Sequence, residues 1–243
     1  EEEAGQNKVV TANIDIYARY VQIQTKSSID AKTIKVLNPK EVVFEGGREL
    51  ELDAVSEVPR YYVCNAYGVC GIYSAPGTAV KEAYDTSGIV TNDRGVTVWL
   101  KGNRVSRNQI MAIKEESVTE QKNSLAVCLD NILRHAGITR NTEYDLAQGK
   151  TATTILSENM TGVQVLDLSG CTLDAVLYYV NQDIPVLAIL EDGEAVLVTG
   201  FNEFNVVIME PATGKLYKKG MNDATAWFAE NGNHFITYMR IEN

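Results

Sequence analysis

The stretch NSLAVCLDNILRHAG, residues 123–137, predicts an amphipathic helix. Asn123 or Ser124 can cap its first turn, and Gly137 stands where a left-handed residue commonly ends a helix. The apolar side chains recur at the spacing of one helix face; they are Leu125, Val127, Cys128, Leu129, Ile132 and Leu133. The pattern therefore predicts an amphipathic helix that opens the C-terminal half of the chain.

The residues after this helix predict a second helix and then an antiparallel sheet. Residues 173–180 (LDAVLYYV) have a helical apolar pattern, with Thr172 as the cap. Three short apolar runs bounded by turns follow, then a helix and a last strand, at 185–190, 195–201, 206–209, 224–230 and 234–240. Helices first and strands after is typical of the α+β class.

The N-terminal half is predicted to be β-rich. Residues 1–55 alternate apolar and polar side chains, as in a small sandwich or barrel. Residues 56–105 read as two strands, a helix begun by Pro76 and two more strands, a ββαββ-like module. The polar stretch 106–122 is the expected linker, which leaves 123–243 as the last domain of a chain with at least two.

Composition excludes some classes of partner. The 243 residues carry a net charge of −10 and no run of Lys and Arg, so we expect no binding to nucleic acid. No apolar run reaches the roughly 20 residues of a membrane helix, so we expect no membrane segment in this chain. The chain begins Glu1-Glu2-Glu3 and not with methionine, so we expect a signal or anchor to have been removed. We expect no cofactor, and nothing in the sequence sets the oligomeric state.

Cys64 and Cys70 flank a predicted hairpin turn. Two cysteines that face each other across a hairpin can form a disulfide in an oxidising compartment. Two reduced, half-buried thiols are the alternative, and both stay open at this point.

Four segments together resemble the C39-type and C39-like peptidases, a branch of the papain-like fold. Residues 123–137 resemble the central helix of that family, and 193–201 (GEAVLVTGF) resemble a strand that begins Gly-His-Ala-Val. Residues 209–214 (MEPATG) resemble the Asp-Pro-x-x-Gly turn of that family, and 227–238 resemble its closing helix and strand. The resemblance covers about half the chain, from Gln121 to the end, and it implies a papain-like C-terminal domain.

The resemblance also implies where catalytic groups would stand. The cysteine position falls on Ser124, the histidine position on Glu194 and the aspartate position on Glu210, while Gln121 lies near the place of the oxyanion glutamine. A serine needs an adjacent base, and a glutamate with an ordinary pKa near 4.3 is too weak a base. The resemblance thus implies a non-catalytic homologue, a binding or structural module for a peptide or protein ligand. We expect it to be bacterial and secreted or attached to the cell surface.

An active cysteine peptidase or acyl-transfer enzyme is the alternative. Cys128 would then be the nucleophile with His234 as its base, or Cys171 would serve at the start of the helix that follows it. A bond between Cys128 and Cys171 is the non-catalytic reading of these two thiols. His135 is expected at the surface or interacting with the helix dipole at the C-terminal end of its helix.

A cation site or a carboxylate acid/base pair is a third hypothesis. It would use Glu194 and Glu210 with two neighbouring carboxylates, Glu191 and Asp192. Charged residues before a strand are more often a solvated turn, which is the competing interpretation.

Overall fold

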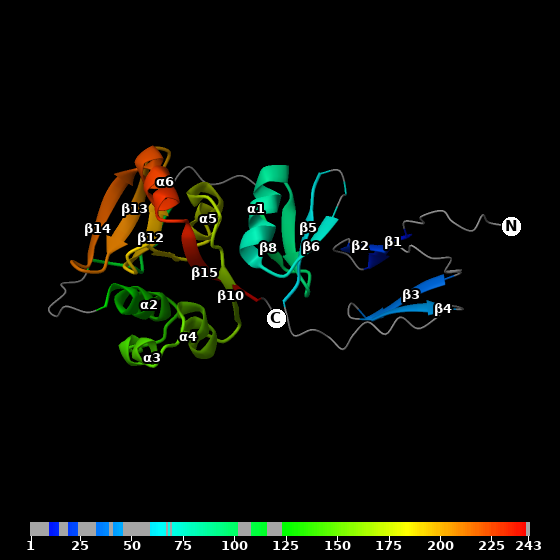
Figure 1. The fold of residues 1–243 in the computed structure, drawn as a ribbon, viewed down its shortest axis with the longest axis horizontal. Helices are drawn as coiled ribbons and strands as arrows, with labels where there is room; N and C mark the ends of the chain where they lie inside the picture. Colours follow the sequence, from blue (N-terminus) through cyan, green and yellow to red (C-terminus); the bar gives the residue numbers. More distant parts are fainter. Residues whose placement is uncertain are drawn as a thin grey trace.

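The computed structural model describes strands at 10–14, 19–23, 33–38 and 41–45, and then residues 59–66, 68, 70–101, 108–115 and 123–241. A seven-stranded antiparallel sheet forms the centre of the C-terminal part (Figure 1). Six of its strands run in the order β10-β15-β11-β12-β13-β14, and the seventh, β9, pairs with β12. Their bounds are β9 Asn108–Gln109, β10 Val163–Asp167, β11 Val186–Ile189, β12 Ala195–Phe201, β13 Asn205–Glu210, β14 Lys215–Gly220 and β15 His234–Arg240.

Helices cover both faces of this sheet. On β15, Tyr238 contacts His135 of one helix layer, whereas the Phe235 ring packs against Phe228 of the other. Residues three apart on a strand point to opposite faces. Figure 1 shows the same division, with α2 (Ser124–His135), α3 (Glu143–Ala147) and α4 (Ala152–Asn159) below the sheet and α5 (Leu173–Val180) and α6 (Met221–Glu230) above it. The architecture is mixed α/β, but the helices and strands interleave more than the predicted order of helices first.

A second sheet follows the element order predicted for residues 56–105. Its four antiparallel strands run in the order β6-β5-β7-β8, with one helix packed on them. The bounds are β5 Tyr61–Cys64, β6 Cys70–Tyr73, α1 Pro76–Thr86, β7 Ile89–Asn92 and β8 Thr97–Leu100. Pro76 is the first helical residue, where its missing N–H has no cost, and Ser87 ends the helix in the left-handed conformation.

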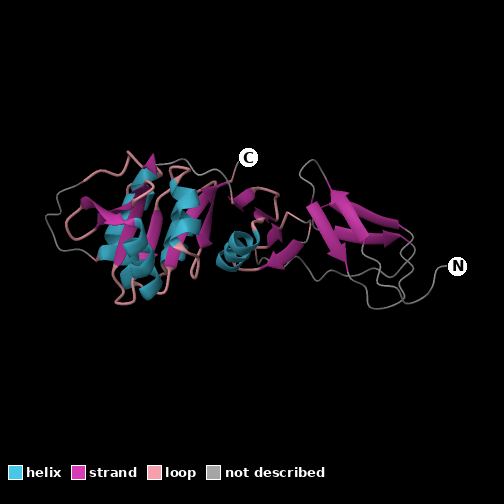
Figure 2. Ribbon diagram, turned by 90° about the horizontal axis from the view of Figure 1, so that it is seen from above, coloured by secondary structure: helices cyan, strands magenta, loops and turns pink. Residues whose placement is uncertain are grey.

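The two sheets share one hydrophobic core. The indole of Trp99 donates a hydrogen bond to the Ala175 carbonyl at 3.0 Å, and the Tyr179 hydroxyl donates to the Val98 carbonyl at 3.1 Å. Gly77 must be glycine at this junction, because an added Cβ would lie 2.8 Å from the Ser169 carbonyl oxygen. The second sheet therefore stands directly beside the main sheet (Figure 2).

A buried polar chain adds to this junction. The Asn92 amide donates to the Gln164 side chain on β10, and Gln164 donates in turn to the Tyr61 hydroxyl, each at 3.0 Å. Satisfied networks of this kind hold buried elements in one arrangement, because separating them would leave polar groups without partners.

Part of the expected linker is packed structure. Within 106–122 the structure describes residues 108–115, and β9 there pairs with Gly200 and Phe201 of β12. Ile110 and Ile113 are both buried in the core. The sequence prediction rested on the polar residues of this stretch, but two isoleucines in it suffice to anchor it. The division of the chain into domains stays a prediction.

The N-terminal strands pair as two hairpins, β1 (Val10–Ile14) with β2 (Arg19–Ile23) and β3 (Thr33–Asn38) with β4 (Glu41–Glu45). Both pairings are antiparallel, which agrees with a β-rich start of the chain. Whether these hairpins form the predicted sandwich or barrel lies outside the described residues.

Candidate functional site

The N-terminus of α2 is closed by its own cap. The Asn123 side chain accepts hydrogen bonds from the backbone N–H groups of Leu125 and Ala126, at 2.9 and 3.2 Å. These are donors that the first turn of a helix leaves without partners. Of the two caps that the sequence allows, the structure uses Asn123, so Ser124 is the first helical residue.

Ser124 joins this helix to the sheet. Its hydroxyl oxygen accepts a hydrogen bond of 2.9 Å from the backbone N–H of Ala195, the first residue of β12. The strand register explains why that N–H needs the hydroxyl: Leu197 pairs with Met209, so Ala195 would face position 211, beyond the last residue of β13. Ser124 is 9% exposed, and its hydroxyl takes the place of the missing strand partner.

Glu194 and Glu210 lie at the same edge of the sheet as this contact. Glu194 is the residue before Ala195, and its side chain is exposed. Glu210 ends β13 and accepts a hydrogen bond of 2.7 Å from the Thr213 hydroxyl. Ser124 therefore contacts Ala195, the residue that follows Glu194, and Glu210 lies on the adjacent strand. The hydrogen bond that Ser124 accepts comes from the backbone of Ala195 and not from either glutamate side chain.

Cys128 lies one helical turn further along α2, in the core. Its exposed fraction is zero. Burial raises the pKa of the Cys128 thiol well above its usual value, and the negative charge of Glu194 raises this pKa further. A neutral, inaccessible thiol is a poor nucleophile.

Cys171 is equally unsuited to attack a substrate. Its thiol is buried and donates a hydrogen bond to the Gly77 carbonyl at 3.3 Å. Burial is the main cause that raises the pKa of this thiol to about 12. Cys128 and Cys171 are both free thiols, so the bond between them considered from the sequence is absent.

Neither histidine is placed to activate Ser124 or Cys128. His234 is exposed at the start of β15, where it pairs with Ile189, which pairs in turn with Ala195. One strand, β11, lies between His234 and Ala195, so the two residues are two strand spacings apart, or about 10 Å.

His135 lies at the far end of α2. Its Nδ1 is 3.1 Å from the Tyr238 hydroxyl, and its Nε2 is 3.8 Å from a carboxylate oxygen of Asp183. Burial lowers the pKa of His135, while the Asp183 charge acts in the opposite direction. Only 5% of its side chain is exposed, so His135 is not a surface residue. It does lie in the last turn of α2, where the sequence predicted a partner of the helix dipole.

The third hypothesis, a cation site built from carboxylates, finds no support in the described residues. Among the residues that the structure describes, no group of three or more His, Cys, Asp or Glu side chains could hold a metal ion. The residues named for it instead form a turn: the Glu194 backbone N–H donates to the Asp192 carboxylate at 3.0 Å, and the Leu190 N–H donates to the Glu194 carbonyl at 2.8 Å. The solvated turn is the correct interpretation of Glu191 and Asp192.

The possible disulfide and the possible oxyanion residue have different outcomes. Cys64 and Cys70 form a disulfide between paired positions of β5 and β6. Gln121, named for an oxyanion site, lies outside the described residues.

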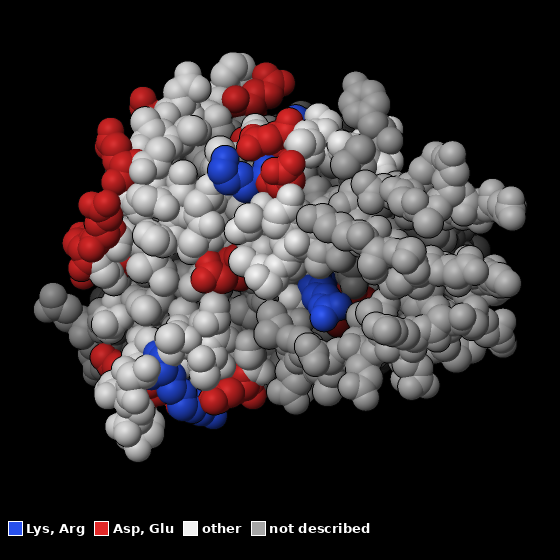
Figure 3. Space-filling view, turned by 45° about the vertical axis from the view of Figure 1, so that its right-hand side comes forward, with Lys and Arg blue, Asp and Glu red and all other residues white. Residues whose placement is uncertain are grey.

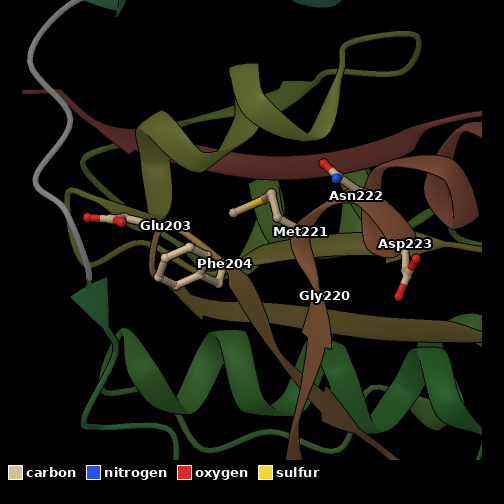
Figure 4. A pocket seen from close by; sticks show the side chains of 6 residues that line it. All are labelled: Glu203, Phe204, Gly220, Met221, Asn222 and Asp223. Carbon is tan, nitrogen blue, oxygen red and sulfur yellow. The ribbon is translucent and has the colours of Figure 1, made fainter.

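A hollow of about 270 Å³ opens between the β12–β13 turn and the start of α6. Figure 4 shows the Phe204 and Met221 side chains beside each other in it. The sequence did not predict this hollow, because Phe204 lies in a turn between two strands and belongs to no apolar pattern. Its unusual feature is structural: the side chain is 71% exposed, which is high for an aromatic residue. Its lining residues are Glu203, Phe204, Gly220, Met221, Asn222 and Asp223.

The surface in Figure 3 carries widely spread acidic side chains, while basic ones form only small groups. A broad basic patch of the kind that tracks phosphates is not visible on this face. In the described residues, no helix is both long and apolar enough to cross a membrane.

Comparison with known proteins finds a distant structural similarity and no sequence match. No protein family matches the sequence, and no curated protein matches it. The crystal structure of a candidate C39-like peptidase from Bacillus anthracis resembles the chain with a TM-score of 0.48 and 12% identity, over 56% of this chain and 99% of that one. A likeness of this degree assigns no activity to the chain.

Proposed function

We propose that residues 123–241 form a non-catalytic, papain-like module of the C39-like type that binds a peptide or protein ligand. The observation that carries this proposal is the hydrogen bond from Ala195 N–H to the Ser124 hydroxyl. It joins the two segments, the central helix and the GEAV strand, that the sequence resemblance aligned independently. Ser124, which stands at the position of the family's nucleophile, therefore accepts a hydrogen bond from the backbone of β12.

The chemistry of the surrounding groups supports the same proposal. A nucleophile requires a base within hydrogen-bond reach, about 2.6 to 3.2 Å. Ser124 uses its oxygen as an acceptor, Cys128 is buried, and His234 lies two strands from Ala195. The alternative of an active cysteine enzyme has no accessible thiolate among these groups.

Secretion or attachment to a bacterial cell surface belongs to the proposal. The Cys64–Cys70 disulfide supports it, because disulfides persist in oxidising compartments and are rare in reducing ones.

Thiol labelling and peptide cleavage test the loss of catalysis together. Iodoacetamide is added to the native and to the urea-unfolded protein, and mass spectrometry follows each cysteine. We expect Cys128 and Cys171 to react only after unfolding, and a proteome-derived peptide library to stay uncut. A thiol that reacts faster in the native protein, with cleavage lost on its substitution by alanine, would refute the proposal.

Ligand binding is tested on the same peptide library by backbone NMR shifts. The expected site is the mouth of α2, by which we mean the N-terminal end of that helix with Ser124, Glu194 and Ala195. We expect bound peptides to shift the amide signals of Ala195 and its neighbours, and we expect the variant Glu194→Lys to weaken the binding of those peptides. The matched control is Glu158→Lys on the exposed side of α4. Bound peptides that shift only distant signals, or an equal effect of both variants, would contradict the location of the ligand.

A further inference from the structure

Strand β14 forms one edge of the main sheet. Its inner side pairs with β13 along the whole strand. Among the described residues no strand pairs with its outer side. Backbone groups alternate between the two sides of an antiparallel strand. Because the N–H of Leu216 donates to a side chain outside the sheet, the N–H and C=O groups of Lys218, two residues further on, also point outward.

A carboxylate already binds this outer edge. The side chain of Glu115, 101 residues earlier in the chain, accepts a hydrogen bond of 3.1 Å from the Leu216 N–H. The Glu115 oxygen thus occupies the place that a carbonyl of an added strand would take. The outward N–H of Leu216 is thus occupied by an anionic acceptor, and the outward backbone groups of Lys218 are the next ones along the edge.

The side chains of β14 are cationic within an acidic region. Residues 121–243 contain fifteen acidic and eight basic side chains, and three of those eight are Lys215, Lys218 and Lys219 on this one strand. Lys215 and Lys218 are exposed. The Lys219 ammonium lies 5.1 Å from the centre of the Trp227 ring, which holds this side chain over α6.

We propose that the outer edge of β14 binds an extended, acidic peptide segment of a partner protein by strand addition. The backbone groups of Lys218 supply the main-chain hydrogen bonds, and the lysines pair with acidic side chains of the segment. Complementary charge fixes which segments bind and in which position. This surface goes beyond the proposed function, because it uses none of the residues at the mouth of α2.

The probe is a fluorescein-labelled peptide of eight residues that alternates glutamate with valine, titrated with the full chain in fluorescence polarisation. One control peptide carries methyl groups on alternate backbone nitrogens, which removes its strand hydrogen bonds. A second has lysine in place of glutamate. We expect saturable binding of the acidic peptide, weakened about tenfold or more by either change and reduced by added salt.

Two variants of the protein locate the binding. Lys218→Pro removes the outward N–H but leaves the pairing with β13, since the inward donors belong to other residues. The double variant Lys215→Gln with Lys218→Gln removes two charges and keeps every backbone donor, and Lys81→Gln on α1 is its matched control. We expect both β14 variants to weaken binding about tenfold, and the control to bind like the wild type.

Equal binding of the methylated or lysine peptides would overturn the proposal, and so would unchanged binding by both β14 variants. If Lys218→Pro lowers the melting temperature of the protein, its weaker binding could come from unfolding, and the double glutamine variant alone then decides whether the peptide binds at β14. Concentration-dependent dimers that Lys218→Pro abolishes would assign the edge to a second copy of the chain and would also overturn it. Failure here leaves the mouth of α2 untouched, since its test uses other residues.

Discussion

Replacing Ser124 with alanine should destabilise the fold, because it removes the acceptor of the Ala195 N–H. Ala195 is 1% exposed, so water does not readily replace the hydroxyl. A buried donor left without a partner costs about 1 to 3 kcal/mol. Alanine returns about 0.5 kcal/mol as the better helix former. We therefore expect the free energy of unfolding to fall by about 1 to 2 kcal/mol.

Urea unfolding followed by fluorescence of Trp99 and Trp227 measures this change. The melting temperature should fall by about 2 to 8 °C, given roughly 2 to 4 °C per kcal/mol for a protein of this size. Ser157→Ala is the matched control, because Ser157 is an exposed serine on α4. Equal stability of the two variants would refute the structural role of the Ser124 hydroxyl, and so would a peptidase activity that Ser124→Ala alone removes.

Three other changes test the core and its thiols. Gly77→Ala should cost about 1 to 3 kcal/mol in urea unfolding, because its Cβ would meet the Ser169 carbonyl oxygen at 2.8 Å; wild-type stability would mean that the two sheets can separate there. Trp99→Phe keeps a ring but loses the hydrogen bond to Ala175, so the melting temperature should fall, and an unchanged value would contradict this contact. For Cys171, the folded pKa of about 12 lies above the ordinary 9.0, so the folded state holds the proton more tightly. Stability should then decline as the pH rises from about 9 toward 12, and Cys171→Ala should decline less over that range; equal slopes would contradict the burial of the thiol.

The central helix and its cap could be predicted because their causes are local. The apolar spacing of residues 123–137 and the side chain of Asn123 act within one or two turns. The burial of Cys128 follows from the same helix, since a residue one turn beyond the first lies on the face that packs against the sheet. For His135 local reasoning gave the place in the last turn of α2 but not the shielding of its side chain, because the contact with Tyr238 comes from 103 residues away.

The packing of the second sheet against the main one could not be predicted. The contacts that create it join residues 70 to 100 positions apart, as from Trp99 to Ala175 and from Gly77 to Cys171. No periodicity in either segment encodes such a partner. The same applies to the stretch 106–122, whose many polar residues drew attention away from the two buried isoleucines, Ile110 and Ile113. Composition alone therefore gave no sign that part of this stretch pairs with β12.

The two segments that meet at Ser124 could be named from the sequence, but the hydrogen bond between them could not. The resemblance pointed to Ser124 at the start of α2 and to Glu194 directly before β12, and in the structure the Ser124 hydroxyl meets the N–H of Ala195, the first residue of β12. What the sequence could not show is that β13 ends too early to satisfy the Ala195 N–H. A hydroxyl at position 124 can supply that acceptor, whereas sulfur is a weaker one. The serine at this position is therefore accounted for by the backbone donor that its hydroxyl satisfies.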